Sequence, residues 1–154
     1  MPWVKFCLKS MNHKKIASGI FKFEGLLESE IKKILNYPQY TKLQIKVLLQ
    51  LDANETWTNL KDMSLSLKIS QTSITRVVDR MQKQRLIHFK VDKNDRRKIL
   101  IKIAPAGNEL LKIFYELIDN FLKKIDKGLN KSEKKYFYLV FEKINLTHFL
   151  SDLE

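Results

Sequence analysis

Apolar residues recur every three or four positions near the start of the chain, which is the spacing of one face of a helix. The residues of this face are Ile16, Ile20, Phe23, Leu27, Ile31 and Ile34. The pattern predicts a long helix that ends by Pro38, because the residue before a proline avoids helical backbone angles. A second helix is predicted after Thr41, its expected cap, with an apolar face of Leu43, Val47, Leu48 and Leu51.

A polar break, "DANETW", precedes a pair of shorter helices. Thr58 and Ser70 are their expected N-caps, because a hydroxyl can accept a bond from the first free N–H groups of a helix. The apolar residues are Leu60, Met63 and Leu67 in the first helix, and Ile74, Val77, Val78 and Met81 in the second. Two helices joined by a turn of three or four residues form a helix-turn-helix.

The segments "LIHFKV" and "KILIKI" alternate apolar and polar residues, and this predicts two strands joined by the loop "DKNDRR". A hairpin directly after a helix-turn-helix supplies a wing. Pro105 begins a further long helix, whose stripe is Leu110, Phe114, Leu117, Phe121 and Ile125. Gly128 is its expected stop. Ser132 then opens a last helix, with Tyr136, Leu139, Val140 and Ile144 as its apolar positions. We therefore expect a mainly α fold with a small β-hairpin wing (α+β).

The positive charge is concentrated around this hairpin. The 154 residues carry a formal net charge of +12. Residues 68–102 hold eleven basic and three acidic side chains, so two-thirds of the net charge lies in this segment. A run of charge is often no more than a solvated surface. Concentration of this degree favours an electrostatic contact with a polyanion such as nucleic acid.

Other classes of function lack support in the sequence. The four glycines form no phosphate loop, and the single cysteine excludes an intrachain disulfide and a cysteine-based zinc site. The three histidines share no ligand spacing. We therefore expect no enzyme activity, no metal and no cofactor. No apolar run approaches the roughly 20 residues of a membrane span, and Lys5 and Lys9 interrupt any signal peptide. We expect a cytoplasmic protein without a membrane partner.

In this order and spacing, the segments resemble the MarR (multiple-antibiotic-resistance regulator) family of winged helix-turn-helix transcription factors. "TKLQIKVLLQL" is similar to the family's second helix, and "TNLKDMSLSLKISQTSITRVVDRMQKQRLI" to its helix-turn-helix. "VDKNDRRKILIKIAPAG" is similar to its wing, with Asp95, Arg97 and Gly107 at the family spacing. The chain departs from the family in Ile103-Ala104 for Leu-Thr, in Arg85 for a glycine and in Phe89 for an arginine. Arg85 must take a left-handed conformation or end its helix differently.

The resemblance implies one domain over residues 1–154, with a winged helix-turn-helix at 41–104 and dimerisation helices at 1–36 and 105–154. The helix after Ser70 has hydrogen-bonding side chains at its start, where such helices meet base edges in the major groove. The candidates are Gln71, Thr72, Ser73, Thr75 and Arg76. Ser70 is chiefly a cap, and Gln71 and Arg76 are the preferred base contacts.

The wing carries the second group of candidates. By the resemblance, Arg97 would enter a narrow minor groove, drawn by its negative potential. Asp95 would orient the wing and pair with an arginine, because a carboxylate is repelled by phosphate. Lys93, Arg96 and Lys98 would meet phosphates. A merely solvated turn would not require the surrounding positive charge.

The remaining expectations concern assembly and regulation. Phe6, Phe137, Phe141, Phe149 and Leu150 are expected at a homodimer interface, and for Phe21 ordinary core packing is preferred. Such a dimer would read two half-sites of a pseudo-palindromic operator. The resemblance also implies a small-molecule effector of unknown identity. Cys7 lies too early in the first helix for the redox sensors of the family, so we expect it to be buried or inert.

We therefore expect a sequence-specific double-stranded DNA-binding regulator, responsive to a ligand or signal and acting as a repressor. Two alternatives stay open at this stage. One is a winged-helix module that docks a protein partner, and the other is a non-specific nucleic-acid binder, including RNA. The target genes, the operator and the direction of regulation are not encoded in these patterns.

Overall fold

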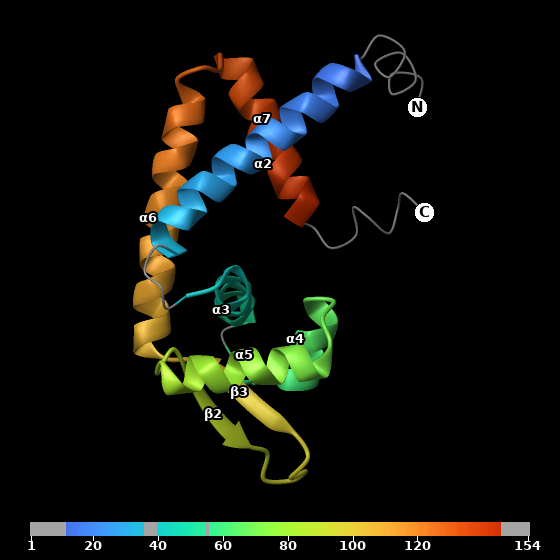
Figure 1. The fold of residues 1–154 in the computed structure, drawn as a ribbon, viewed down its shortest axis with the longest axis vertical. Helices are drawn as coiled ribbons and strands as arrows, with labels where there is room; N and C mark the ends of the chain where they lie inside the picture. The colour runs from blue at the N-terminus through green and yellow to red at the C-terminus, as the bar shows by residue number, and fades with distance from the viewer. Residues whose placement is uncertain (1–11, 36–39, 55, 146–154) are drawn as a thin grey trace. The chain divides into compact units, whose positions relative to one another are not determined.

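The computed structural model describes residues 12–35, 40–54 and 56–145, so Pro38 lies outside the described residues. The chain divides into two compact units, residues 1–117 and 118–154. The helices are α2 (His13–Leu35), α3 (Lys42–Asn54), α4 (Leu60–Ser66), α5 (Gln71–Lys83), α6 (Pro105–Asp126) and α7 (Lys131–Asn145) (Figure 1). The strands are β1 (Thr58–Asn59), β2 (Ile87–Val91) and β3 (Ile99–Ile103). The predicted mainly α fold with a hairpin wing is confirmed.

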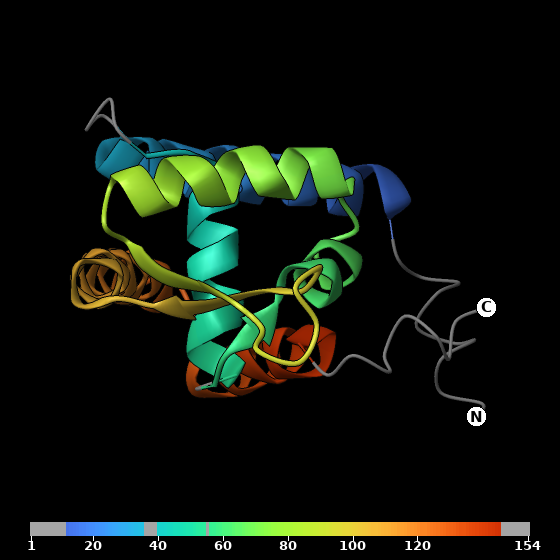
Figure 2. The same ribbon diagram turned by 90° about the horizontal axis from the view of Figure 1, so that it is seen from below.

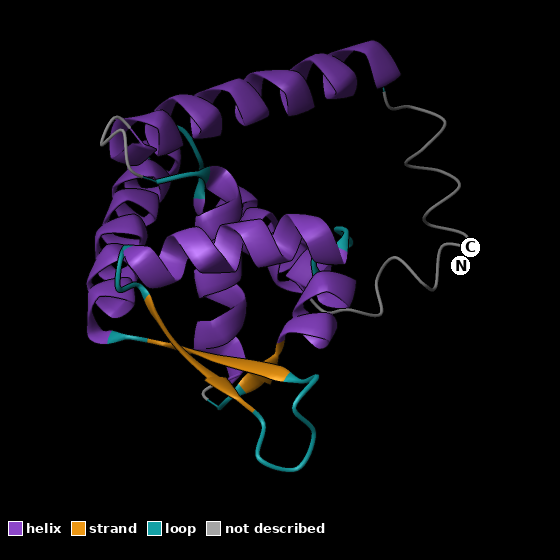
Figure 3. Cartoon of the chain, turned by 60° about the horizontal axis from the view of Figure 1, so that its bottom comes forward, coloured by secondary structure: helices purple, strands orange, loops and turns teal. Residues whose placement is uncertain are grey.

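The three strands form one antiparallel sheet in the order β1-β3-β2 (Figure 3). In the hairpin, Ile87 pairs with Ile103 and Val91 pairs with Ile99. The sequence pattern missed β1. Thr58, which was expected to cap the next helix, instead lies in this short strand opposite Ile101. Asn59 is the true cap of α4, since its side chain accepts a 2.8 Å hydrogen bond from the N–H of Lys61.

The core of the first unit lies between α3, α4, α5 and the sheet. Its side chains are almost wholly removed from solvent, and they include Leu48, Met63, Ile74, Val78, Met81 and Ile101. Burying an aliphatic side chain of this size contributes about 1.5–3 kcal/mol. In α3, α4 and α5 the predicted apolar face is therefore the face that packs, with Leu43, Leu67 and Val77 half-buried. Predicted apolar positions of α2 and α7 are instead exposed, namely Ile16, Ile20, Tyr136, Leu139 and Val140. The core fixes α5 with its opposite face in solvent.

α5 begins and ends with defined caps. Ser70 is confirmed as its N-cap, because the Ser70 hydroxyl accepts a 3.2 Å hydrogen bond from the N–H of Ser73. At the other end Arg85 has φ 59°, the left-handed conformation that the loss of glycine makes costly. The N–H of Leu86 reaches the carbonyl of Met81 at 2.9 Å, which closes the last turn. The helix thus ends as a glycine-capped helix does, with Arg85 in the glycine position.

α6 is joined to α3 and to the end of the helix-turn-helix. The Tyr115 hydroxyl donates a 2.6 Å hydrogen bond to Asp52 of α3. Burial, followed by this bond, raises the pKa of Tyr115 to about 12. Ala104 replaces the usual hydroxyl cap. Its N–H donates to the carbonyl of Leu86 at 3.0 Å, and its own carbonyl accepts from Gly107 and Asn108. Backbone bonds therefore hold the start of α6 without a side-chain cap.

In the second unit, Asn130 caps α7, and Ser132, which was expected to open this helix, lies inside it. The Asn130 side chain accepts hydrogen bonds from the N–H groups of Ser132 and Glu133, at 3.0 and 3.1 Å. The Glu133 carboxylate in turn accepts from the N–H of Asn130 at 2.7 Å. This reciprocal capping box satisfies more free N–H groups than Ser132 could, so the helix begins at Lys131. Along the described parts of the chain, no helix is long and apolar enough to cross a membrane.

Replacing Gly107 with alanine should lower the free energy of unfolding by about 2–3 kcal/mol, the cost of overpacking a tight core. The added methyl group would collide with the carbonyl oxygen of Leu86, and it would lie 2.9 Å from Cγ1 of Ile103. Gly128→Ala is the matched control, because its nearest neighbour would lie 3.5 Å away, at ordinary contact distance. Urea unfolding of both variants measures the difference. Equal stabilities would show that α6 can move away from Leu86 at no cost.

Candidate nucleic-acid interface

The first turns of α5 present polar side chains to solvent. Every residue expected to read bases there is exposed, namely Gln71, Thr72, Ser73, Thr75 and Arg76. The Thr75 hydroxyl donates to the carbonyl of Gln71 at 2.8 Å, and the Ser73 hydroxyl accepts from Ser70 at 2.8 Å. These two hydroxyls are therefore partly engaged within the helix. Their part in DNA binding stays a prediction.

The electrostatics at the start of α5 favour an anion. The first turn contains no acidic residue, and the free N–H groups at a helix N-terminus carry a partial positive charge. Arg76 lies one turn further along and is exposed. A phosphate or the acceptor edge of a base would meet favourable partners here.

The wing loop between β2 and β3 carries exposed basic side chains. Lys93, Arg96 and Lys98 are exposed, and the side chain of Arg97 retains 96% of its accessible surface. Asp95 accepts a 3.0 Å hydrogen bond from the N–H of Arg97, and the same oxygen lies 3.9 Å from the Arg97 Nε atom. Such an exposed ion pair contributes little stability. Asp95 therefore orders the backbone of the tip and leaves the Arg97 guanidinium in solvent.

Asp92 organises the same loop and was missed by the sequence analysis. Its Oδ1 atom accepts hydrogen bonds from the N–H groups of Asn94 and Asp95, at 2.7 and 3.1 Å. The bond from Asn94, then that from Asp95, lowers the pKa of Asp92 below its usual value of 3.8. The spacing of an aspartate two residues before an asparagine in a turn is the signal that could have identified it.

Lys90 and Trp57 form a second contact that the sequence did not reveal. The Lys90 ammonium lies 3.9 Å from the centroid of the Trp57 ring. Lys90 is on β2 opposite Leu100, and Trp57 directly precedes β1, so the contact spans the outer face of the sheet. A cation over an indole contributes about 0.5–1 kcal/mol at an exposed site. The contact ties strand β2 of the wing to the segment just before β1.

α5 and the wing loop lie on the same face of the first unit, which Figure 2 shows from below. One partner could therefore contact the exposed start of α5 and the basic tip together. Phe89, which occupies the position of a family arginine, pairs with Ile101 and is half-buried, so it adds no charge to this face.

The expected dimer residues are only partly described. Phe6, Cys7, Phe149 and Leu150 lie outside the described residues. On α7, Phe137 is half-buried, and its ring centroid lies 4.9 Å from that of Phe141, which is exposed. Other large apolar side chains exposed on this helix are Tyr136, Tyr138, Leu139 and Val140. Phe21, for which core packing was preferred, is 71% exposed. Core packing within the single chain is therefore the wrong interpretation for Phe21.

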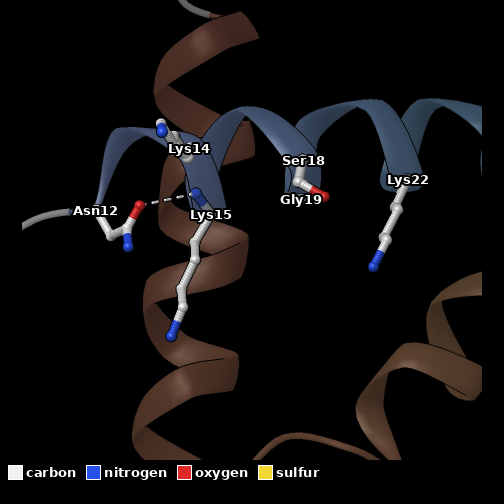
Figure 4. Close-up of a pocket in the computed structure, with 6 residues that line it drawn as sticks. All are labelled: Asn12, Lys14, Lys15, Ser18, Gly19 and Lys22. Carbon is white, nitrogen blue, oxygen red and sulfur yellow. Dashed lines mark hydrogen bonds between the residues drawn. The ribbon is translucent and has the colours of Figure 1, made fainter.

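A basic hollow at the start of α2 carries no assignment. It has a volume of about 350 Å³ and is lined by Asn12, Lys14, Lys15, Ser18, Gly19 and Lys22 (Figure 4). Asn12 directly precedes α2, the other five residues belong to that helix, and all six are exposed, so no second wall holds a ligand. Among the described residues, no cluster of His, Cys, Asp or Glu could hold a metal ion.

Protonation of Asp92 should loosen the wing loop only in strong acid. A lowered carboxyl pKa means that the turn is stabilised above the ordinary pKa of 3.8 and loses that stabilisation as the pH falls through the lower native value. The amide signals of Asn94 and Asp95 in an NMR titration should therefore shift with a midpoint below 3.8. Asp92→Asn keeps an acceptor oxygen and should abolish the transition. A midpoint above the ordinary value would contradict the hydrogen-bonded turn.

Comparison with known proteins connects this geometry to a family. The sequence model of the MarR family matches residues 40–99. The HTH-type transcriptional regulator FarR of Neisseria gonorrhoeae is 24% identical over 121 residues, which cover 79% of this chain and 82% of FarR. The family match includes α3, the helix-turn-helix and the whole wing loop.

Solved structures agree on the fold. A mutant of MepR from a multidrug-resistant S. aureus clinical isolate aligns with a TM-score of 0.68 at 20% identity, covering 94% of this chain and 99% of MepR. A mutant of MarR from E. coli, complexed with operator DNA, aligns with a TM-score of 0.61 at 17% identity, covering 88% of this chain and 99% of MarR. These structures share the winged-helix fold of this chain. The MarR family model thus matches the helix-turn-helix and wing of this chain, and the whole fold is similar to that of solved MarR and MepR structures.

Proposed function

We propose that this chain is a double-stranded DNA-binding transcriptional regulator that recognises a specific sequence. The single observation that carries the proposal is the pairing, on one face, of the exposed polar start of α5 with a basic wing tip. An α-helix fits the major groove, where each base pair has its own pattern of donors and acceptors. A basic tip beside it supplies the phosphate and minor-groove contacts that position the helix.

The roles follow from the chemistry of each side chain. Gln71 and Arg76 can each make two hydrogen bonds to one base edge. Arg97, with its guanidinium almost fully in solvent, would enter an adjacent minor groove. The exposed side chains of Lys93, Arg96 and Lys98 would contact phosphates. The MarR structure with operator DNA supports this assignment by its shared fold.

We propose a homodimer as the functional form, in which α7 contributes the apolar contact. The exposed fractions of 65% at Tyr136 and 53% at Val140 leave much apolar surface in solvent if the chain is a monomer. Under this proposal residues 41–104 bind DNA, and residues 1–36 and 105–154 hold the two copies together. Two identical subunits would read a pseudo-palindromic operator.

Light scattering should give the mass of a dimer for the full chain. Val140→Lys should lower that mass, because a charge buried in an apolar interface is costly. Lys143→Ala, another exposed position on α7, is the control and should leave the dimer intact. A monomeric full chain that still binds specific DNA tightly would contradict this part of the proposal.

The direction of regulation and its signal form a separate proposal. The family consists of transcriptional regulators, so an enzymatic role has no support there. We propose a repressor of the cytoplasm that releases its operator when a small effector or another signal is present. The test is operator binding after addition of candidate effectors, and an affinity that no effector changes would count against this mode.

Affinity for duplex DNA should fall steeply with salt. If a dimer neutralises about 6–10 phosphates, the affinity should drop by roughly a thousandfold or more between about 50 and 200 mM salt. The measurement is a titration against the duplex that the wild type enriches from a random pool, with a scrambled duplex for comparison. A shallow slope without sequence preference would instead favour a module that docks a protein. Tighter binding to RNA would favour the RNA alternative.

The same titration identifies the wing contact. Arg97→Ala should weaken binding to the enriched duplex by roughly 10- to 100-fold, the loss expected for a good contact to a base or groove. Thermal stability should hardly change, because the side chain is exposed. Lys127→Ala, an exposed lysine of the second unit, is the control and should bind as the wild type does. Unchanged affinity with a lower melting temperature would make the wing a purely structural element.

A further inference from the structure

Two glutamine side chains join α3 to the end of α5. Gln44 on α3 has no exposed surface. Its Nε2 atom donates a 2.6 Å hydrogen bond to Oε1 of Gln84, the residue that caps the C-terminus of α5. The partners lie 40 positions apart in the sequence. The bond therefore depends on the way the two helices pack.

Gln44 also holds the start of its own helix. Its Oε1 atom accepts a 2.8 Å hydrogen bond from the N–H of Thr41, and the Thr41 hydroxyl accepts from the N–H of Gln44 at 3.3 Å. This is a reciprocal capping box. Through Gln44 a continuous series of hydrogen bonds runs from the residue before α3, through the core, to the C-cap residue of α5.

Apolar packing alone could fill this space at lower cost. Removing an amide from water is unfavourable unless it is hydrogen-bonded, and replacing both partners by apolar groups of the same shape can be nearly neutral for stability. Apolar packing is not directional, whereas a hydrogen bond weakens steeply when its angle departs from linear. What the pair adds to the buried contacts of Val78 and Met81 is therefore orientation.

Orientation matters most at the opposite end of α5. The helix rises about 1.5 Å per residue, so Gln84 lies about 20 Å from Gln71. A tilt of about 3° at one end would displace the other by about 1 Å. Recognition sites tolerate displacements of about 0.5 Å. The end that contacts bases is thus sensitive to how the C-terminal end is held.

We propose that Gln44 and Gln84 are positioning residues for sequence recognition. Their hydrogen bond fixes the orientation of α5 against α3, so that the side chains at the start of α5 meet the base edges in register. Neither glutamine is itself one of the proposed DNA contacts. The inference rests on the proposed function for its DNA readout, while the held orientation of α5 is a property of the free protein.

The test compares Gln84→Met, the double variant Gln44→Met with Gln84→Met, and Gln82→Met. Methionine has nearly the size of glutamine but makes no amide hydrogen bond. Gln82 is on the same helix and exposed, so Gln82→Met is the matched control. Each protein is titrated against the duplex enriched by the wild type and against a scrambled duplex, and its melting temperature is measured.

Gln84→Met should lose about tenfold or more in affinity for the enriched duplex, and affinity for the scrambled duplex should stay within about twofold, because phosphate contacts tolerate small tilts. The double variant leaves no buried amide without a partner, which should offset the loss of the Gln44 cap at the start of α3 and keep its melting temperature near that of Gln84→Met. It should nevertheless remain unselective. A double variant that recovers stability and selectivity together would overturn the proposal, because the pair would then serve stability alone.

Hydrogen exchange in the free protein separates this inference from the proposed function. The amides of α5 should exchange faster in Gln84→Met than in Gln82→Met if the hydrogen bond restrains the helix. If the wild type prefers no sequence, the proposed function fails, and exchange alone decides the positioning role. Equal exchange in the two variants would overturn it, whatever the DNA result.

Discussion

The architecture depends on the burial of one face of α5. Ile74, Val78 and Met81 are each at most 1% exposed, and their removal from water fixes which way the helix faces. The elements that pack against α5 are α4, β2 and α3. Because apolar burial is the dominant favourable term in folding, the same energy that stabilises the core also keeps the polar start of α5 in solvent. Folding and presentation of the interface are thus one event.

Left-handed backbone after each of the two helices of the helix-turn-helix, α4 and α5, is accepted for the same reason. Lys68 and Arg85 have φ values of 52° and 59°, although a side chain in this conformation costs about 1–2 kcal/mol. Each lies directly after a helix whose packed face sets where the chain must turn. The turn at Arg85 brings Leu86 into the core, where its carbonyl accepts the N–H of Ala104. The strain at Arg85 is therefore offset by tertiary contacts made immediately after it.

The fold was largely predictable because apolar periodicity is local. Every predicted helix and both hairpin strands are confirmed, and so is Ser70 as a cap. The errors concern choices that geometry decides. At α4, Thr58 pairs in strand β1, and Asn59 is therefore the cap. At α7, the reciprocal hydrogen bond to Glu133 favours Asn130 over Ser132. At the candidate site the exposed residues of α5 and the wing were predictable from type and position. The Lys90–Trp57 and Gln44–Gln84 contacts were not, because they join segments distant in sequence.

The strand order leaves β2 as an outer strand of the sheet, with one side of its backbone unpaired by the sheet. Such a border is a template for association with another chain. The lysine at position 90 and the cluster of positive charge in the adjoining loop repel an identical border on a second molecule. The charge of the wing thus opposes pairing of this border with the same border of a second molecule. Substitutions that remove several of these charges would expose a latent tendency to aggregate, and variants of this kind need a check of solution homogeneity before any affinity is compared.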